Sequence, residues 1–377
     1  MVTTSKRGTR LYLWKVAVLA IALIGALMML GASQTAKAWA DDGAGLSAAT
    51  MDDRALQPQS DTEDPSFTRI FGNVALDTMA NIVDQGWAGE TGGTVVLTTV
   101  DGYWDALTAA GIAGMKQAPV LMTDSGALSP QTRTVIESLK PETVVVCGGT
   151  SAVSNDVAQA ACTAAGNANL VRCAGNTATG TACEVFKNAI SEGFGTWSTT
   201  AFVCTNDGYW DALAAAPISY ALGMPIFLTE GADSISAETL ATMKEGGITS
   251  VIIVGGTAAV SDSVANAISD AGIRIKDREW GYNAVRTSSA VAFYGINQDM
   301  VAEHMGVATT NGYWDALAGA PLCGKNNSVL VLVSGPDSES LTSFVKPMKP
   351  KIGASYVFGG EMAIDAATFQ ALKDAIS

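Results

Sequence analysis

The sequence predicts an α/β protein made of three tandem modules, each with its own parallel sheet. The hexapeptide GYWDAL occurs at 102–107, 208–213 and 312–317, so its copies start 106 and 104 residues apart. Around each copy, short apolar runs alternate with stretches of helical spacing, which is typical of βαβ units. The apolar runs are nearly continuous, as expected for strands covered by helices on both faces of a parallel sheet.

Other landmarks recur at matching offsets, as they do in an internal repeat. In each module an Arg is followed by a Gly three residues later and by a Thr nine residues later. These residues are Arg69, Gly72 and Thr78; Arg172, Gly175 and Thr181; and Arg278, Gly281 and Thr287. A later apolar strand ends in a Gly-Gly pair, whose second residue is Gly149, Gly256 or Gly360. Because the chain stops after the helix that follows the third pair, we expect each module to begin at its Arg motif and to contain four strand–helix pairs.

The first module illustrates these pairs. Its expected strands lie at 67–71, 94–99, 118–123 and 143–148, and its expected helices at 74–83, 104–115, 130–139 and 154–165. By the same phase, the three modules occupy 67–169, 170–275 and 276–377. The repeated landmarks fall where a strand ends and a loop leads into a helix, which is where ligands bind in open α/β sheets.

The first 66 residues are expected to lie outside the modules. Basic residues precede a charge-free apolar run at 16–30, and the sequence AKAWA follows. This order is typical of a secretory signal peptide over residues 1–40, cleaved after Ala40, with an uncleaved anchor as the alternative. Residues 41–66 are acidic, polar and without periodicity, which predicts a flexible linker.

Charge and composition limit the classes of function. Removing residues 1–40 leaves 17 basic and 36 acidic residues, a net charge of −19. Binding to nucleic acid depends on Lys and Arg, so nucleic acid is not an expected partner. With His304 as the only histidine and no C-x-x-C pattern, the sequence predicts neither a metal site of the Cys/His type nor a catalytic group.

The chain has six cysteines, and an exported protein permits disulfides between them. They are Cys147, Cys162, Cys173, Cys183, Cys204 and Cys323. Cys147 and Cys204 lie inside apolar strand patterns, where we expect buried thiols. Cys162, Cys173 and Cys183 cluster at the junction of the first two modules, and two of them could form a disulfide bridge.

Two sets of residues within GYWDAL are candidate ligand contacts. The Asp residues are Asp105, Asp211 and Asp315. Each is expected in the first turn of a helix, where the helix dipole favours a carboxylate. The Trp residues are Trp104, Trp210 and Trp314. Each Trp either packs into an interface between modules or presents the flat face of its indole to a ligand.

The third candidate set is the Arg residues, Arg69, Arg172 and Arg278, which are the basic residues repeated in all modules. One interpretation is an internal ion pair with the Asp of GYWDAL. The other is a guanidinium presented to phosphate or carboxylate groups of a ligand. We favour the second, under which Arg172→Ala keeps its melting temperature but loses binding.

Taken in order, these motifs resemble the cell-wall-binding repeat type 2 family. The resemblance rests on Arg-x-x-Gly with its Thr, an aromatic-Asp-Ala-Leu helix start, Pro-Ile-Phe-Leu-Thr and Val-Gly-Gly-Thr-x-Ala-Val-Ser, and it covers residues 67–377. The third module departs from the pattern, because residues 328–334 lack the Pro and Glu361 replaces the Thr after Gly-Gly. The family implies Toprim-like, Rossmann-related modules with parallel sheets, arranged as a pseudo-threefold trimer within one chain.

The resemblance also implies function. We expect a secreted, non-catalytic protein of the Gram-positive cell wall or cell surface, a monomer attached non-covalently to an anionic polysaccharide, with no cofactor and no membrane contact after cleavage. An adhesin or a lattice-forming structural protein is the alternative, and a small-ligand-binding protein or an enzyme comes after these. Helix N-termini or bridging divalent cations would let an acidic chain bind an anionic polymer.

Overall fold

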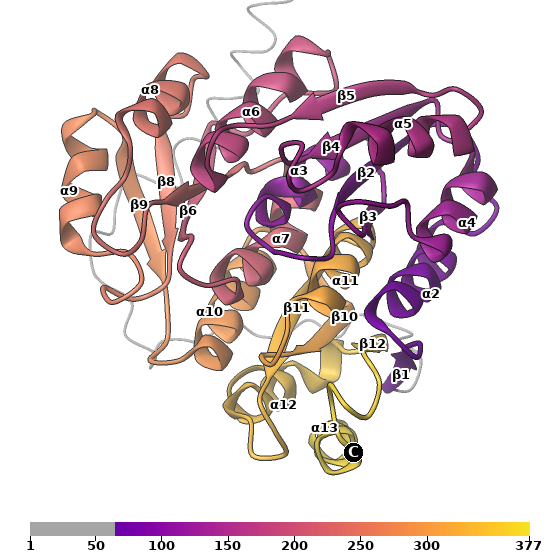
Figure 1. The fold of residues 1–377 in the computed structure, drawn as a ribbon. Helices are drawn as coiled ribbons and strands as arrows, with labels where there is room; N and C mark the ends of the chain where they lie inside the picture. The colour runs from indigo at the N-terminus through magenta and orange to yellow at the C-terminus, as the bar shows by residue number, and fades with distance from the viewer. Residues whose placement is uncertain (1–64) are drawn as a thin grey trace, which may run out of the picture. The chain divides into compact units, whose positions relative to one another are not determined.

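The computed structural model describes residues 65–377, in which three parallel sheets of four strands each are accompanied by helices (Figure 1). The signal peptide expected over residues 1–40 and nearly all of the expected linker lie outside the described residues. The α/β class and the three parallel sheets are confirmed. In the part of the chain that the structure describes, no helix is both long enough and apolar enough to cross a membrane.

Each sheet has the same strand order. The first sheet runs β3 (Val120–Thr123), β2 (Thr94–Thr99), β4 (Thr143–Cys147) and β5 (Asn169–Cys173). The second runs β7 (Ile226–Thr229), β6 (Thr200–Thr205), β8 (Ser250–Val254) and β9 (Arg274–Glu279). The third runs β11 (Ser328–Val333), β10 (Val301–Thr309), β12 (Ala354–Phe358) and β1 (Ser66–Ile70).

The helices follow the strands one by one. The first repeat has α2 (Ala75–Trp87), α3 (Ala109–Met115), α4 (Pro130–Leu139) and α5 (Asn155–Ala164). The second has α6 (Ala178–Ser191), α7 (Trp210–Leu222), α8 (Ala237–Glu245) and α9 (Asp262–Asp270). The third has α10 (Ala284–Asn297), α11 (Trp314–Lys325), a π-helical stretch (Leu341–Val345) that leads into α12 (Lys346–Met348), and α13 (Ala366–Ile376).

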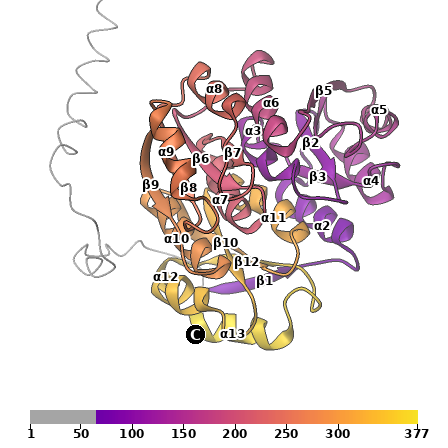
Figure 2. The same cartoon turned by 60° about the vertical axis from the view of Figure 1, so that its left-hand side comes forward.

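The first strand of each sequence repeat belongs to the sheet of another repeat. β5 pairs with β4 and β9 pairs with β8, so each completes the sheet of the preceding repeat. β1 pairs with β12 at the other end of the chain, with Arg69 opposite Val357 and Ile70 opposite Phe358. Figure 2 shows the indigo β1 beside the yellow β12. A repeat that begins at its Arg motif therefore contains four strand–helix pairs, but its four strands do not form one sheet. This corrects the expectation that each module, counted from its Arg motif, has its own parallel sheet.

The helices that begin within or just after GYWDAL, α3, α7 and α11, pack against one another. Small residues permit close approach: a Cβ added to Gly114 of α3 would lie 2.0 Å from the carbonyl oxygen of Tyr220 in α7. A Cβ on Gly324 of α11 would lie 2.6 Å from the Cβ of the same Tyr220. α7 is buried along nearly its whole length, as expected for a helix that is apolar on all sides. These three helices therefore join the repeats through one continuous core.

The first repeat departs from the predicted helix at 104–115. A 3-10 turn at Ala106–Thr108 precedes the short α3, whereas α7 and α11 begin at the Trp of GYWDAL. α3 contains Gly111 and Gly114, and glycine disfavours a regular helix. The close packing of α3 against α7 requires these glycines, because a Cβ on Gly111 would lie 2.7 Å from the Ser219 hydroxyl.

All six cysteines are free and buried. The expectation of buried thiols at Cys147 and Cys204 is confirmed. A bridge between two of Cys162, Cys173 and Cys183 is not present; instead, Cys173 lies directly opposite Cys147 in the β4–β5 pair. The spacing in the sequence could not reveal this neighbour, because it follows from the pairing of β5 with the preceding sheet.

Candidate functional site

The Gly-Gly loop closes the carboxyl end of each sheet. Its first residue has a positive φ, at 121° in Gly148, 106° in Gly255 and 108° in Gly359, and this region favours glycine. The Arg of the adjoining strand holds the loop. The Nη1 of Arg172 donates hydrogen bonds to the carbonyl oxygens of Gly148 at 2.8 Å and Val153 at 3.0 Å.

The other two Arg residues make equivalent contacts. Arg278 donates to Gly255 and Val260 at 2.9 and 2.8 Å, and Arg69 donates to Gly359 and Ile364 at 3.0 and 2.8 Å. Among residues 65–377 the ion pairs involve only Lys187 and Lys325, so the interpretation that we did not favour, an internal ion pair between Arg and the Asp of GYWDAL, is wrong. Burial lowers the pKa of all three guanidinium groups, which nonetheless stay protonated. Contact between these Arg residues and a polymer stays a prediction.

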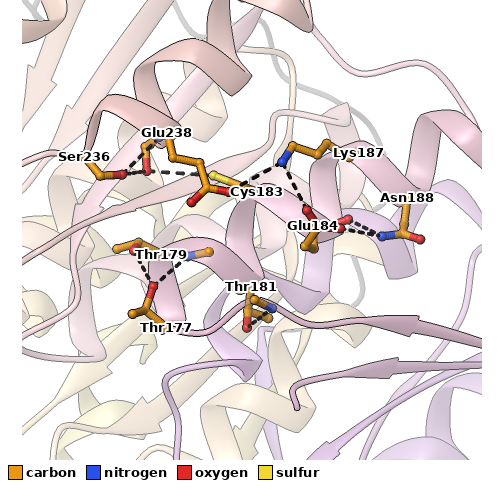
Figure 3. A network of polar contacts seen from close by, with 12 residues as sticks. Thr177, Thr179, Thr181, Cys183, Glu184, Lys187, Asn188, Ser236 and Glu238 are labelled. Carbon is orange, nitrogen blue, oxygen red and sulfur yellow. Dashed lines mark hydrogen bonds and ion pairs between the residues drawn. The ribbon is translucent and has the colours of Figure 1, made fainter.

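The Gly and Thr of the Arg motif fasten the strand to the following helix. The backbone N–H of Gly175 donates to the Thr181 hydroxyl at 3.2 Å, and the equivalent bonds in the other repeats are both 3.0 Å. A Cβ on Gly175 would lie 2.2 Å from the carbonyl carbon of Gly180, so the chain can approach α6 only with glycine here. Figure 3 shows Thr181 beside Thr177, whose hydroxyl caps α6 by accepting from Gly180 N–H at 3.1 Å.

The Asp residues of GYWDAL pack against the Gly-Gly loops. Asp211 and Asp315 lie in the first turn of α7 and α11, as predicted, whereas Asp105 precedes the 3-10 turn. Their carboxylate oxygens lie close to the first Gly of the loop: a Cβ on Gly255 would be 2.5 Å from Asp211 Oδ2. Burial raises the pKa of Asp211 to about 7 and that of Asp315 to about 6, and it also raises the pKa of Asp105.

We expect the protein to be more stable near pH 5 than near pH 8. Burial raises the pKa of Asp211 from 3.8 to about 7 in the folded state, and burial next to Asp277 raises the pKa of Glu279 from 4.5 to about 7. The folded state therefore favours the protonated forms, and their stabilisation is complete below pH ~4 and lost as the pH rises through ~7. For each of the two groups the difference between pH 5 and pH 8 is on the order of 2 kcal/mol.

Thermal melting from pH 5 to pH 8 checks this expectation. Asp211→Asn, which has the same shape without the charge, should melt higher than the parent chain at pH 8 and show a weaker pH dependence. A melting temperature that rises toward pH 8 in the parent chain, or a pH dependence that Asp211→Asn leaves unchanged, would contradict this assignment of the buried charge.

The Tyr of GYWDAL joins the repeats, a role that the sequence alone did not indicate. The rings of Tyr103, Tyr209 and Tyr313 meet, with centroids 5.3, 5.5 and 5.7 Å apart. The Tyr209 hydroxyl donates to Thr310 O at 2.9 Å, and the Tyr313 hydroxyl donates to Val100 O at 2.7 Å. Each repeat thus supplies one aromatic ring to a shared cluster, which accounts for the presence of the hexapeptide in three copies. The Tyr-Trp pair, which is repeated in all three copies of the hexapeptide, was the feature of the sequence that could have indicated this cluster.

Two of the Trp residues, Trp210 and Trp314, pack between repeats, which is the first of the two predicted roles, and contact of a Trp with a ligand stays a prediction. Trp210 Nε1 donates to Thr310 O at 2.8 Å in the third repeat, and Trp314 Nε1 donates to Val100 O at 2.9 Å in the first. Each indole lies against the preceding Tyr, at 4.4 or 4.5 Å between centroids. The indoles of Trp104, Trp210 and Trp314 remain 49%, 36% and 38% exposed. Trp210 and Trp314 therefore join repeats, and all three Trp residues leave part of their surface exposed.

A cleft of about 250 Å³ lies beside Trp210 at the carboxyl end of the second sheet. It is lined by Thr205, Asp207, Gly208, Trp210, Asp211, Ala258 and Ala259. An apolar surface with a few polar groups and a carboxyl of raised pKa is typical of a ligand site. Of the sequence candidates, the cleft brings together Trp210 and Asp211, whereas Arg278 bonds the Gly-Gly loop and does not line the cleft. Within residues 65–377, no group of three or more His, Cys, Asp or Glu is placed to hold a metal ion.

Comparison with known proteins finds the same three repeats that the sequence shows. The family model of cell wall binding domain 2 (CWB2) matches residues 69–158, 172–265 and 278–369. The chain is 31% identical over 274 residues to the N-acetylmuramoyl-L-alanine amidase LytC of Bacillus subtilis (strain 168), covering 72% of this chain and 51% of that protein. It is 29% identical over 287 residues to the amidase enhancer of the same organism, covering 74% of this chain and 37% of that protein.

Solved structures share the fold. Cwp6 from Clostridium difficile superposes with a TM-score of 0.73 at 19% identity, covering 86% of this chain and 50% of that one. Cwp8 from the same organism superposes with a TM-score of 0.69 at 21% identity, covering 82% and 51%. The chain spans about half of the length of one curated relative that it matches and 37% of the other. With its three matched repeats, the chain belongs to the cell wall binding domain 2 family.

Proposed function

We propose that this protein is exported and attaches non-covalently to an anionic polysaccharide of the cell wall, without catalysing a reaction. The family match supports binding to the cell wall. The observation that carries the proposal is the carboxyl edge that occurs three times, each with a partly exposed Trp, a partly buried Asp and a Gly-Gly loop held by Arg. A polymer offers many copies of one unit, so several weak sites on one chain reinforce each other.

We also propose that the modules are Toprim-like, Rossmann-related units arranged with pseudo-threefold symmetry within a monomer. The pairwise packing of α3, α7 and α11 and the cluster of three tyrosines support this arrangement. The amidase and the amidase enhancer are longer than this chain, so their activities are not carried over to it.

Because the chain is acidic overall, an anionic polymer must bind at particular groups of its surface that attract anions. Backbone N–H groups at helix N-termini bind anions without basic side chains. A divalent cation is the second means; since residues 65–377 hold no preformed metal cluster, surface carboxylates and the anionic groups of the polymer would share it.

A pull-down on purified Gram-positive cell walls tests the proposal. The chain without residues 1–40 should sediment with intact walls and much less with walls whose phosphodiester-linked polymers have been removed with hydrofluoric acid. Retention should fall as salt rises if direct anion contacts dominate, and fall with a chelator if cations bridge. An unrelated protein of similar net charge is the control, and the supernatant should gain no soluble wall fragments.

Equal retention on intact and stripped walls would contradict an anionic polymer as the partner. Self-association of the chain, or binding to another surface protein without wall binding, would instead support a lattice-forming protein or an adhesin.

A further inference from the structure

Two exposed tryptophans flank the Gly-Gly loop of the second sheet. Trp210 lines the cleft on the side of Ala258 and Ala259. Trp280, at the end of β9, lies against the start of the same loop, since a Cβ on Gly256 would be 3.3 Å from its Cε3 atom. The Trp280 indole is 56% exposed. The Gly-Gly loop of the second sheet thus has one exposed Trp near Gly256 and another near Ala258 and Ala259.

The other two sheets lack this combination. The position of Trp280, two residues after the Arg, is occupied by Ala174 at the first sheet and by Phe71 at the third. Phe71 is 52% exposed and lies near Gly360, but the next residue in that loop is the carboxylate Glu361. A pair of indoles around an uncharged loop therefore occurs only at the second of the three described sheets.

The polar groups of the cleft identify the class of ligand. Asp207 and Asp211 offer carboxyl groups and Thr205 a hydroxyl, and all three accept hydrogen bonds from sugar hydroxyls. Carboxylates repel phosphate or uronate groups, so the anionic groups of a polymer would point away from the cleft. The segment that follows β6 and lines the cleft is held by hydrogen bonds. Asp207 N–H donates to Thr205 Oγ1 at 3.1 Å, and Gly231 N–H donates to the side chain of Asn206 at 2.8 Å. A neutral pyranose, which has an apolar C–H face for stacking and hydroxyls around its rim, fits these features.

We propose that the second sheet carries the principal saccharide site of the chain, with one neutral pyranose of the wall polymer stacked on Trp210 in the cleft and the neighbouring part of the glycan against Trp280. The proposal rests on the proposed function and names the chemistry of one of its three edges. Under this proposal the three sheets contribute unequally to binding. The first sheet, which has Trp104 alone, and the third, which has Glu361 in its loop, contribute less than the second.

The test compares Trp280→Ala with Trp104→Ala. Both side chains are about half exposed, and Trp104 is the matched control because its sheet has Ala174 where the second has Trp280. Affinity is measured for intact walls and for the neutral saccharide released from them with hydrofluoric acid, the latter by quenching of tryptophan fluorescence. Trp280→Ala should weaken binding to both probes about fivefold to tenfold, and Trp104→Ala less than about twofold, with melting temperatures close to the parent chain.

Equal losses in the two variants would overturn the proposal, because they would make the edges equivalent. Unchanged affinity of Trp280→Ala for both probes would also overturn it, while leaving wall attachment in place. If the parent chain binds neither probe, the proposed function itself fails, which distinguishes the two failures.

Discussion

A chain that starts at residue 72 is expected to lose the third sheet, although the deleted segment belongs to the first sequence repeat. β1 pairs with β12 along its length, and Gly359 N–H donates to Ile70 O at 2.9 Å. The deletion removes the buried side chains of Phe67 and Ile70, the strand ladder and the Arg69 bonds to the third Gly-Gly loop. These losses amount to roughly 5–10 kcal/mol, comparable to the stability of a whole domain.

Hydrogen exchange read by mass spectrometry locates the damage. In the shortened chain, amides of β10, β11 and β12 should lose their protection, whereas those of β6 to β8 should keep most of theirs. A chain that starts at residue 65 is the control and should match the full-length protein over these segments. Loss of protection confined to β2, β3 and β4 would contradict the pairing of β1 with β12.

The elements of the fold could be predicted from the sequence, but the division into sheets could not. The expected strands at 94–99, 118–123 and 143–148 correspond to β2, β3 and β4, because an apolar run bounded by turn residues is a local signal. The pairing of β1 with β12 joins the two ends of the described chain and has no local signal. Because the first strand of each sequence repeat pairs with another repeat, the phase of the sequence repeat does not identify the residues that share a sheet.

The site was predictable to the same extent. The positions of Asp211 and Asp315 followed from the rules for the first helical turn. The partners of Arg172 did not, because Gly148 and Val153 accept through main-chain oxygens, which leave no mark on the side-chain sequence. The three tyrosines meet only through the packing of the repeats, so the pattern alone could not separate a shared cluster from three independent cores.

The contacts of Arg172 reverse the result expected from the sequence for Arg172→Ala. We now expect this variant to lose about 2–4 kcal/mol of stability, because the carbonyl oxygens of Gly148 and Val153 lose their charged donor. The loss should fall toward the lower end of the range, since Arg172 Nη2 is itself buried without a hydrogen-bond partner, and its removal relieves that cost.

Chemical denaturation beside a wall pull-down decides between the two roles of Arg172. Arg133→Ala is the matched control, because Arg133 lies exposed on α4 and its loss should change stability by less than about 0.5 kcal/mol. Arg172→Lys should fall between the parent chain and Arg172→Ala, because a single ammonium group keeps the charge but not the planar geometry of the guanidinium. At a temperature where every variant is folded, Arg172→Ala should retain most of its wall binding. An unchanged midpoint together with lost retention would show instead that the guanidinium faces the polymer, and the loop would then have to be held by the glycine conformation and the packing of Asp105 alone.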